Sequence, residues 1–373
     1  MDILLSHETA LAVLRLPLMA RRLERGERCD EHVPQAPPTP EEAESLLRLL
    51  PVLAGRGGPI DVLVASAEVR VRSQLVNSHV WSASLPSGSA VAVVPGIRCA
   101  SPEHLVVQMT PALTDLELMV LLAELLGSYA VDPNVKRGMV QRERPIMTPE
   151  RLLAHLSDLG PVSGCARIRR ALGMVCVGAA SPRETKLSLR LGLKPALGGY
   201  HLPVLSMNEP MEVRRIHDAM RCGVRKPDIL LLAPDGPPDA SKPFCGRAVE
   251  YEGEDHRDPR RLAANVERHN ELVALGFGEY WVAKEQYGNL SYMDGLAGRL
   301  RADLGMAPLR LSDKEAARRR ALRLGLYEEL ERIDGTRWDG RARERDRVAT
   351  PAPASSVAKE DWDVVPVEAY GLG

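Results

Sequence analysis

The pattern of apolar and polar positions changes partway along the chain. Between Pro59 and Val94, short apolar segments separated by polar, Gly or Pro residues predict strands: IDVLVA, QLVNSHVWSA and SAVAVV. On either side of this region, apolar residues recur at helical spacing in four stretches, residues 7–16, 40–50, 102–108 and 115–129. Residues 1–133 are therefore predicted to form an α+β domain, and the basic residues 136–144 an irregular link.

The second half of the chain alternates between the two periods. Ser181-Pro182-Arg183-Glu184 has the N-cap, proline and acidic residue of a helix start. Strands follow, then a helix beginning at Asp258-Pro259, then the strand GEYWVAKEQY. This order predicts an α/β domain with a mixed sheet over residues 145–308. Residues 309–373 are predicted to be a charged helix, best explained by a solvated face, and a flexible tail.

Three carboxylates lie on two predicted strands of this second domain. Asp228 begins the strand 228–233, and Glu250 and Glu252 lie two residues apart on the strand 247–251 and its end, so they point to one face. If the strands pair, the three carboxylates converge, and their repulsion requires a cation or a proton. Hard oxygen ligands of this kind suit Mg²⁺. The alternative is that Glu250 and Glu252 cap an exposed edge strand.

Composition narrows the classes of function. The chain has 373 residues, 45% hydrophobic and 27% charged, with a net charge of -1, so contact with nucleic acid would need a local basic patch. Its six cysteines form no C-x-x-C pair, which argues against a zinc module and a secreted disulfide framework. The sequence predicts a cytoplasmic protein with no membrane segment. Residues 1–133 indicate no chemistry, and His79 and Trp81 are expected to be packed or surface residues.

A family resemblance rests on these motifs. A helix with SPRET, a strand with Pro227-Asp228, the residues Glu250-Tyr251-Glu252, then a helix and a strand resemble the PD-(D/E)XK nuclease superfamily. Gly253, His256, Asp258 and Pro259 make the chain similar to the branch of very-short-patch repair endonucleases. The resemblance covers roughly residues 181–286. Residues 2–129, with SHETALAVLR and SHVWSASLP, look like the corresponding part of AbiEi-type abortive-infection antitoxins, without their helix-turn-helix.

The resemblance implies a restriction-endonuclease-like core that cleaves phosphodiester bonds with Mg²⁺ or Mn²⁺. Asp228 and Glu250 would hold the cation. Glu184 would be a further ligand or orient water, although helix capping explains it equally well. Glu252 stands where the family has Lys. His256 would act as general acid or base, and Lys226, Arg268 or Lys284 could supply the missing positive charge. Phosphate contacts are expected from basic residues around the motif, namely Arg225, Lys226, Arg257, Arg260 and Arg261.

Two alternative functions follow from this resemblance. The first is a divalent-metal-dependent DNA endonuclease-like protein in defence or repair. The alternative is a catalytically degenerate nuclease fold that acts as an antitoxin or transcriptional regulator and binds nucleic acid or a partner protein. Glu252 at the position of the family's Lys is the feature that keeps both open.

Overall fold

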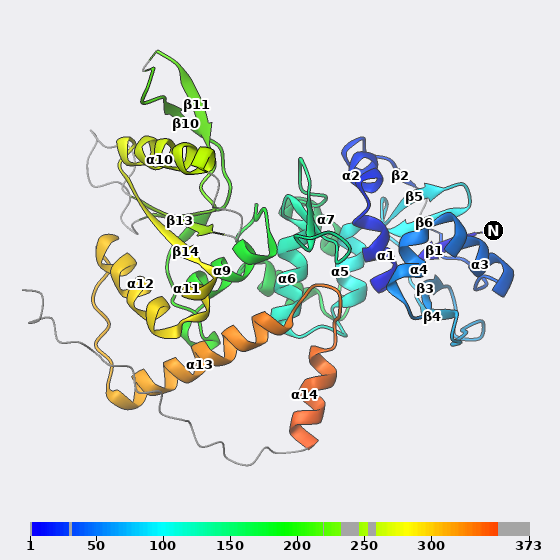
Figure 1. Cartoon of the computed structure of the whole chain (residues 1–373). Helices are drawn as coiled ribbons and strands as arrows, with labels where there is room; N and C mark the ends of the chain where they lie inside the picture. Colours follow the sequence, from blue (N-terminus) through cyan, green and yellow to red (C-terminus); the bar gives the residue numbers. More distant parts are fainter. Residues whose placement is uncertain (1, 30–31, 219, 233–245, 253–258, 350–373) are drawn as a thin grey trace, which may run out of the picture.

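The computed structural model describes residues 2–29, 32–218, 220–232, 246–252 and 259–349, and for residues 259–265 and 347–349 the backbone alone. Helices make up 44% and strands 19% of the structure, and both larger sheets are mixed. The chain is therefore of the α/β or α+β class, as the sequence predicts. Figure 1 shows an elongated molecule, with one sheet toward each end and helices between them.

The first sheet has six strands in the order β2-β5-β6-β1-β3-β4. Its members are β1 (Ile3–Leu5), β2 (Arg28–Cys29), β3 (Ile60–Val64), β4 (Val76–Val80), β5 (Ala90–Val94) and β6 (Ile97–Ala100). The β1–β6 and β3–β4 pairs are parallel, and the other pairs are antiparallel. β3 is buried along its whole length, as its continuous apolar run predicts.

Six helices accompany this sheet: α1 (His7–Leu14), α2 (Pro17–Glu24), α3 (Pro40–Leu49), α4 (Pro51–Arg56), α5 (Pro102–Met109) and α6 (Asp115–Leu125). Thr39 and Thr114 begin α3 and α6 with capping boxes, which satisfy backbone N–H groups that have no partner within the helix. A short hairpin of β7 (Tyr129–Val131) and β8 (Met139–Gln141) follows. Part of the predicted irregular link 136–144 is thus a strand, because it pairs with β7.

The first hydrophobic core extends beyond residue 133. Helices α7 (Pro149–Asp158) and α8 (Cys165–Leu172), placed by the sequence in the second domain, bury Leu152, Leu156 and Ile168 in the same cluster as α5 and α6. Leu326, Leu330, Ile333 and Trp338, far along the chain, join this cluster too. The first core therefore contains residues from both sides of the predicted boundary at residues 133–144.

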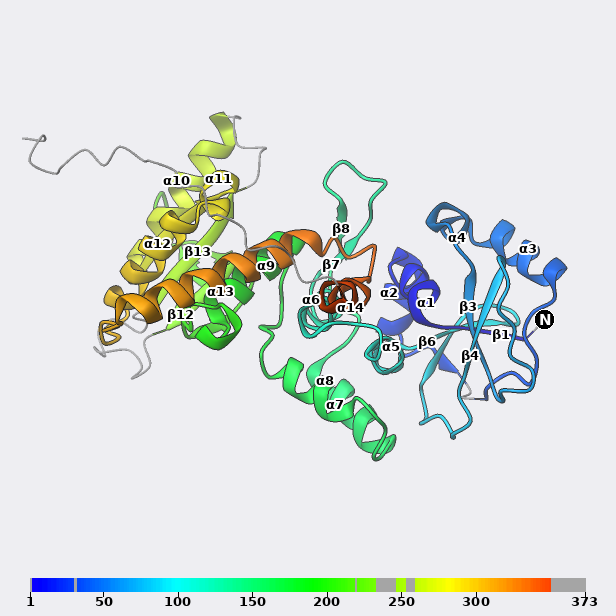
Figure 2. The same ribbon diagram turned by 90° about the horizontal axis from the view of Figure 1, so that it is seen from below.

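The charged C-terminal region is more ordered than its composition suggests. Helix α13 (Asp313–Arg332) runs beside α9 (Pro182–Gly192) toward the first domain, and α14 (Gly340–Ala349) follows it (Figures 1 and 2). The Gly340 N–H donates to Glu117 Oε1 at 2.8 Å, and Arg343 pairs with Glu329 at 2.7 Å. The expected flexible tail is thus a helix over residues 340–349, because buried Trp338 anchors the preceding segment.

The second sheet has four strands in the order β14-β13-β12-β9. They are β9 (Val204–Ser206), β12 (Ile229–Leu232), β13 (Gly246–Glu252) and β14 (Phe277–Ala283). β13 and β14 are parallel, and β12 is antiparallel to both β13 and β9. Ile229, Leu231 and Val249 pack with Leu187 and Leu191 of α9 (Pro182–Gly192), while Leu230 and Ala248 pack with Leu272 of α10 (Pro259–Ala274). The sheet therefore lies between α9 and α10.

The remaining elements surround this sheet. The 3-10 helix η1 (Pro195–Leu197) follows α9, and α11 (Lys284–Gly288) and α12 (Leu290–Asp303) follow β14. β10 (Met211–Arg214) and β11 (Cys222–Arg225) form a hairpin that projects past α10 (Figure 1). Among the described residues, no helix is both long enough and apolar enough to cross a membrane.

Candidate functional site

The predicted acidic pair, Asp228 and Glu250, meets at the junction of β12 and β13. The antiparallel register that sets Ile229 opposite Val249 brings Asp228 beside Glu250. Asp228 Oδ2 accepts the Tyr251 N–H at 2.8 Å, and Glu250 Oε1 accepts the Asp228 N–H at 3.3 Å. Each carboxylate is therefore fixed by the backbone of the other strand, and Glu250 is only 4% exposed.

The two carboxylates perturb each other. Burial raises the pKa of Glu250 to about 9, assisted by the charge of Asp228 and opposed by Arg268. The pKa of Asp228 is also raised, chiefly by burial, against the lowering effects of the Tyr251 hydrogen bond and Arg268. Among the described side chains, Asp228 has no basic partner at ion-pair distance. An incoming cation would therefore be stabilised at this pair.

Glu184 approaches the same point from the start of α9. Its carboxylate accepts the Ala180 N–H and the Ser181 hydroxyl, both at 2.8 Å, and Asn208 Nδ2 at 2.6 Å. Asn208 also donates its N–H to Pro227 O, next to Asp228. Burial, followed by Asp228, raises the pKa of Glu184 to about 7. The capping explanation is thus present in the structure, and the oxygens of Glu184 are already engaged by donors.

Arg268 brings positive charge to the pair from α10. Its Nη2 lies 2.5 Å from Glu250 Oε2 and donates to Lys226 O at 2.8 Å. Arg268, one of the three cations expected to replace the family's Lys, is thus at ion-pair distance from Glu250. Glu252 is the last residue of β13 and is half-buried.

A further acid, Glu279 on β14, was not predicted. Its side chain is fully buried, Oε2 contacts His269 Nδ1 at 2.5 Å, and Oε1 has no hydrogen-bond partner among the described residues. Its charge contributes to the raised pKa values of Asp228 and Glu250. The signal in the sequence is weak, because a Glu within GEYWV also fits an exposed strand position.

The arrangement limits how a metal would be held. Among the residues described, no three His, Cys, Asp or Glu side chains form a group that could hold an ion. Mg²⁺, however, commonly uses one or two carboxylates and completes its shell with water and substrate phosphate. Asp228 and Glu250 supply hard oxygen donors whose repulsion a cation would relieve, so they fit a divalent cation held by two protein carboxylates.

The basic residues that were expected to contact phosphate lie in different environments. Arg225 Nε contacts Glu271 Oε2 at 2.5 Å, and Glu271, which is fully buried, also pairs with Arg215 at 3.4 Å. Arg225 therefore fastens the β10–β11 hairpin to α10 rather than facing solvent, whereas Lys226 is exposed. Arg260 and Arg261 lie on α10 with side chains outside the described part. His256 and Arg257 lie outside the described residues altogether.

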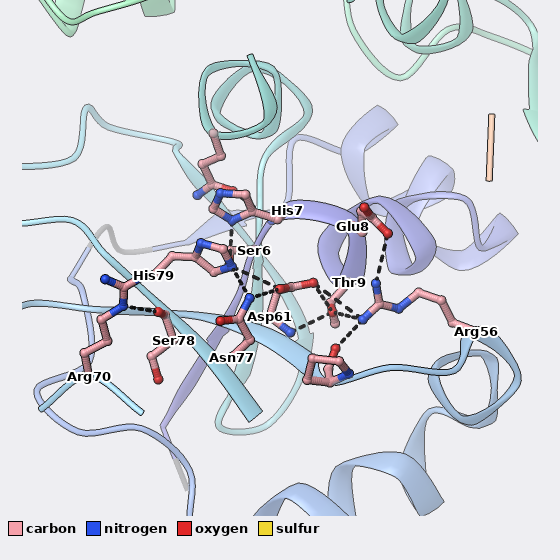
Figure 3. A network of polar contacts seen from close by, with 12 residues as sticks. Ser6, His7, Glu8, Thr9, Arg56, Asp61, Arg70, Asn77, Ser78 and His79 are labelled. Carbon is pink, nitrogen blue, oxygen red and sulfur yellow. Dashed lines mark hydrogen bonds and ion pairs between the residues drawn. The ribbon is translucent and has the colours of Figure 1, made fainter. Parts of the chain in front are cut away.

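A polar network in the first domain was also missed by sequence reasoning (Figure 3). Asp61 on β3 accepts hydrogen bonds from Thr9 Oγ1 at 3.1 Å, Asn77 Nδ2 at 2.9 Å and His79 Nε2 at 3.0 Å. The His79 ring stacks on His7 with centroids 3.6 Å apart. Burial, and then His79, lowers the pKa of His7 to about 3. The available signal is Asp61 itself, a carboxylate inside the apolar run IDVLVA.

This network connects the start of α1 to β3 and β4. His7 has a left-handed backbone with φ +47°, and its N–H donates to Gln108 Oε1 of α5. Although burial opposes ionisation, the His79 and Asn77 hydrogen bonds hold the pKa of Asp61 below its usual range. Arg56 approaches the same carboxylate at 3.5 Å. These contacts account for the network as a buried structural junction.

Comparison with known proteins gives no match: no family model, no curated protein and no solved structure is significantly similar to this chain. Functional inference therefore rests on the geometry of the acidic pair.

Proposed function

We propose that the chain is a divalent-metal-dependent endonuclease-like protein whose cation is held by Asp228 and Glu250. The observation that supports this most is the meeting of Asp228 and Glu250 where β12 and β13 pair, with Glu184 near enough for the charge of Asp228 to affect its pKa. Burial raises all three pKa values, and the charge of Asp228 adds to the rise at Glu250 and Glu184. Perturbed acids gathered in this way are typical of functional sites.

Each of the named side chains has its own role in the proposed reaction. Mg²⁺ or Mn²⁺, when bound, would polarise a phosphoryl oxygen and acidify a water molecule. Asp228 and Glu250 would hold the ion, with Arg268 released from Glu250 to face the scissile phosphate, where a guanidinium can bind two oxygens. Glu184, fixed by Ser181 and Asn208, would help to orient the water molecule beside Asp228 and Glu250. Exposed Lys226 would contact the phosphate backbone of DNA.

A second function is favoured by one specific observation. Arg268 already lies at ion-pair distance from Glu250, and the third motif position holds Glu252 instead of a Lys. A permanent Arg268–Glu250 pair would fill the site without a metal. The domain would then be a regulator or antitoxin that binds nucleic acid or a partner protein without cleaving it.

A plasmid-nicking assay distinguishes the two. We expect wild-type protein to nick supercoiled DNA with Mn²⁺ or Mg²⁺ and not with EDTA. Asp228→Asn should abolish nicking, because the substitution removes the charge but keeps the side-chain volume. Glu212→Gln, which removes an exposed carboxylate on β10 of the same domain, is the matched control and should retain full activity.

Two results would reject catalysis. Wild-type protein that binds DNA but never nicks it would support the regulator. Nicking that persists in Asp228→Asn would indicate a contaminating nuclease or a site elsewhere.

A further inference from the structure

A pocket far from the acidic pair lies between α2 and residues 140–146. Its cavity has a volume of about 370 Å³, which is within the range of small-molecule sites. Pro17, Ala20, Leu23 and Ile146 form its apolar wall. Four arginines and two glutamates also line the pocket, namely Arg15, Arg21, Arg142, Arg144, Glu24 and Glu143.

The charges of this pocket do not balance. Arg15 is bound in a bidentate manner by buried Glu124, at 2.8 and 2.7 Å, and Arg144 pairs with Glu24 at 3.5 Å. Arg142 and Arg21 have no carboxylate at ion-pair distance within the part of the chain that the structure describes. Exposed Glu143 is the remaining acid, so the pocket keeps an excess of positive charge.

Arg142 is the unusual member. The residue is only 8% exposed, yet among the described residues its guanidinium makes two long hydrogen bonds, both 3.5 Å, to the carbonyl oxygens of Leu14 and Glu124. A buried guanidinium normally has a paired anion or short hydrogen bonds, because desolvation of an ion is costly. Burial lowers the pKa of Arg142 to about 10, even though Glu124 acts in the opposite direction. An anion at Arg142 would relieve this cost.

We propose that this pocket binds a small phosphate monoester, with the phosphate at Arg142 and Arg21 and the organic part against the apolar wall. Guanidinium groups match the planar, two-oxygen geometry of phosphate, and Arg21 can reach the anion from the exposed face of α2. This site is independent of the acidic pair, which lies in the second sheet and consists of carboxylates rather than guanidinium groups.

Calorimetric titration tests the site with three probes: adenosine 5′-monophosphate, inorganic phosphate and adenosine. EDTA is present, so that no metal links a nucleotide to the acidic pair. We expect saturable binding of the monophosphate, weaker binding of phosphate, and none of adenosine. Arg21→Gln should weaken monophosphate binding by about tenfold, the loss of one charged hydrogen bond. Arg25→Gln is the matched control, since Arg25 lies at the end of α2, outside the pocket, and should bind as wild type.

Several outcomes would overturn the proposal. Absence of saturable binding of both phosphate and the monophosphate would eliminate the anion site. Equal weakening by Arg21→Gln and Arg25→Gln would show nonspecific attraction. Monophosphate binding no tighter than phosphate would exclude a role for the apolar wall. Because Arg142→Gln could disturb α1 and α6, whose carbonyls it contacts, Arg21 carries the decisive comparison.

Discussion

Replacement of Glu250 by Gln tests whether the acidic pair is electrostatically strained without metal. The folded-state pKa of Glu250 is about 9, against 4.5 for an ordinary Glu. A carboxyl with a raised pKa binds its proton more tightly in the folded state, so stability falls as pH rises from about 4.5 to 9. Gln cannot ionise and resembles the protonated form.

The size of the effect follows from the pKa difference. One pH unit corresponds to about 1.36 kcal/mol, so between pH 5 and pH 8 the wild type would lose up to about 4 kcal/mol relative to Glu250→Gln. Since the contact with Arg268, which is a quarter exposed, leaves the site open to screening by solvent, we expect roughly half of that limit. The two proteins should be equally stable near pH 5, and the variant more stable at pH 8.

Urea unfolding at pH 5, 6, 7 and 8 measures this difference without metal. Glu212→Gln serves as the control, because it removes an exposed carboxylate and should follow the wild type at each pH. The reasoning is refuted if Glu250→Gln is less stable than wild type at pH 8. That result would mean that Glu250 is ionised and that its Arg268 ion pair stabilises the fold.

Three further predictions concern the rest of the fold. Asp61→Asn leaves Thr9, Asn77 and His79 with a neutral acceptor, so the free energy of unfolding, measured in urea, should fall by about 2 kcal/mol. A fall of less than about 0.5 kcal/mol would contradict the role of this network as a structural junction. Arg225→Ala leaves Glu271 with Arg215 alone, so amide exchange in the β10–β11 hairpin should rise while β12 stays protected; unchanged exchange would show that Arg225 does not fasten it. Trp338→Ala should lower the free energy of unfolding by about 3 kcal/mol and make residues 335–346 sensitive to proteolysis. Arg310 is exposed, so Arg310→Ala should have neither effect.

The spacing of apolar residues along the chain was enough to predict much of the second sheet. The apolar run after Asp228 became β12, and the acidic pair met because two adjacent strands with opposite direction bring Asp228 beside Glu250. The capping role of Glu184 was also visible in SPRE, because an N-cap Ser and an acid three residues later form a local motif. Short-range rules decide such features, so they can be predicted from sequence.

Long-range packing was beyond those rules. Helix α13 looked solvated because Arg and Glu dominate it, yet Leu326 and Leu330 are buried against α9 and the first core. The Asp61 network joins residues 9, 61 and 79, and no spacing rule connects positions so far apart. Arg225 looked like a phosphate contact because it lies in a basic stretch, but its partner Glu271 is 46 residues away.

Titration of metal-free protein with Mn²⁺ tests the central claim most directly, because it asks about the cation itself, with no substrate. If Asp228 and Glu250 hold a divalent ion, wild type should bind one Mn²⁺ per chain at this site, and the free energy of unfolding should rise by about 1.4 kcal/mol at ten times the dissociation constant. Asp228→Asn should lose both effects, while Glu212→Gln keeps them. Wild-type protein with no saturable Mn²⁺ binding, or Asp228→Asn that binds equally well, would contradict the account.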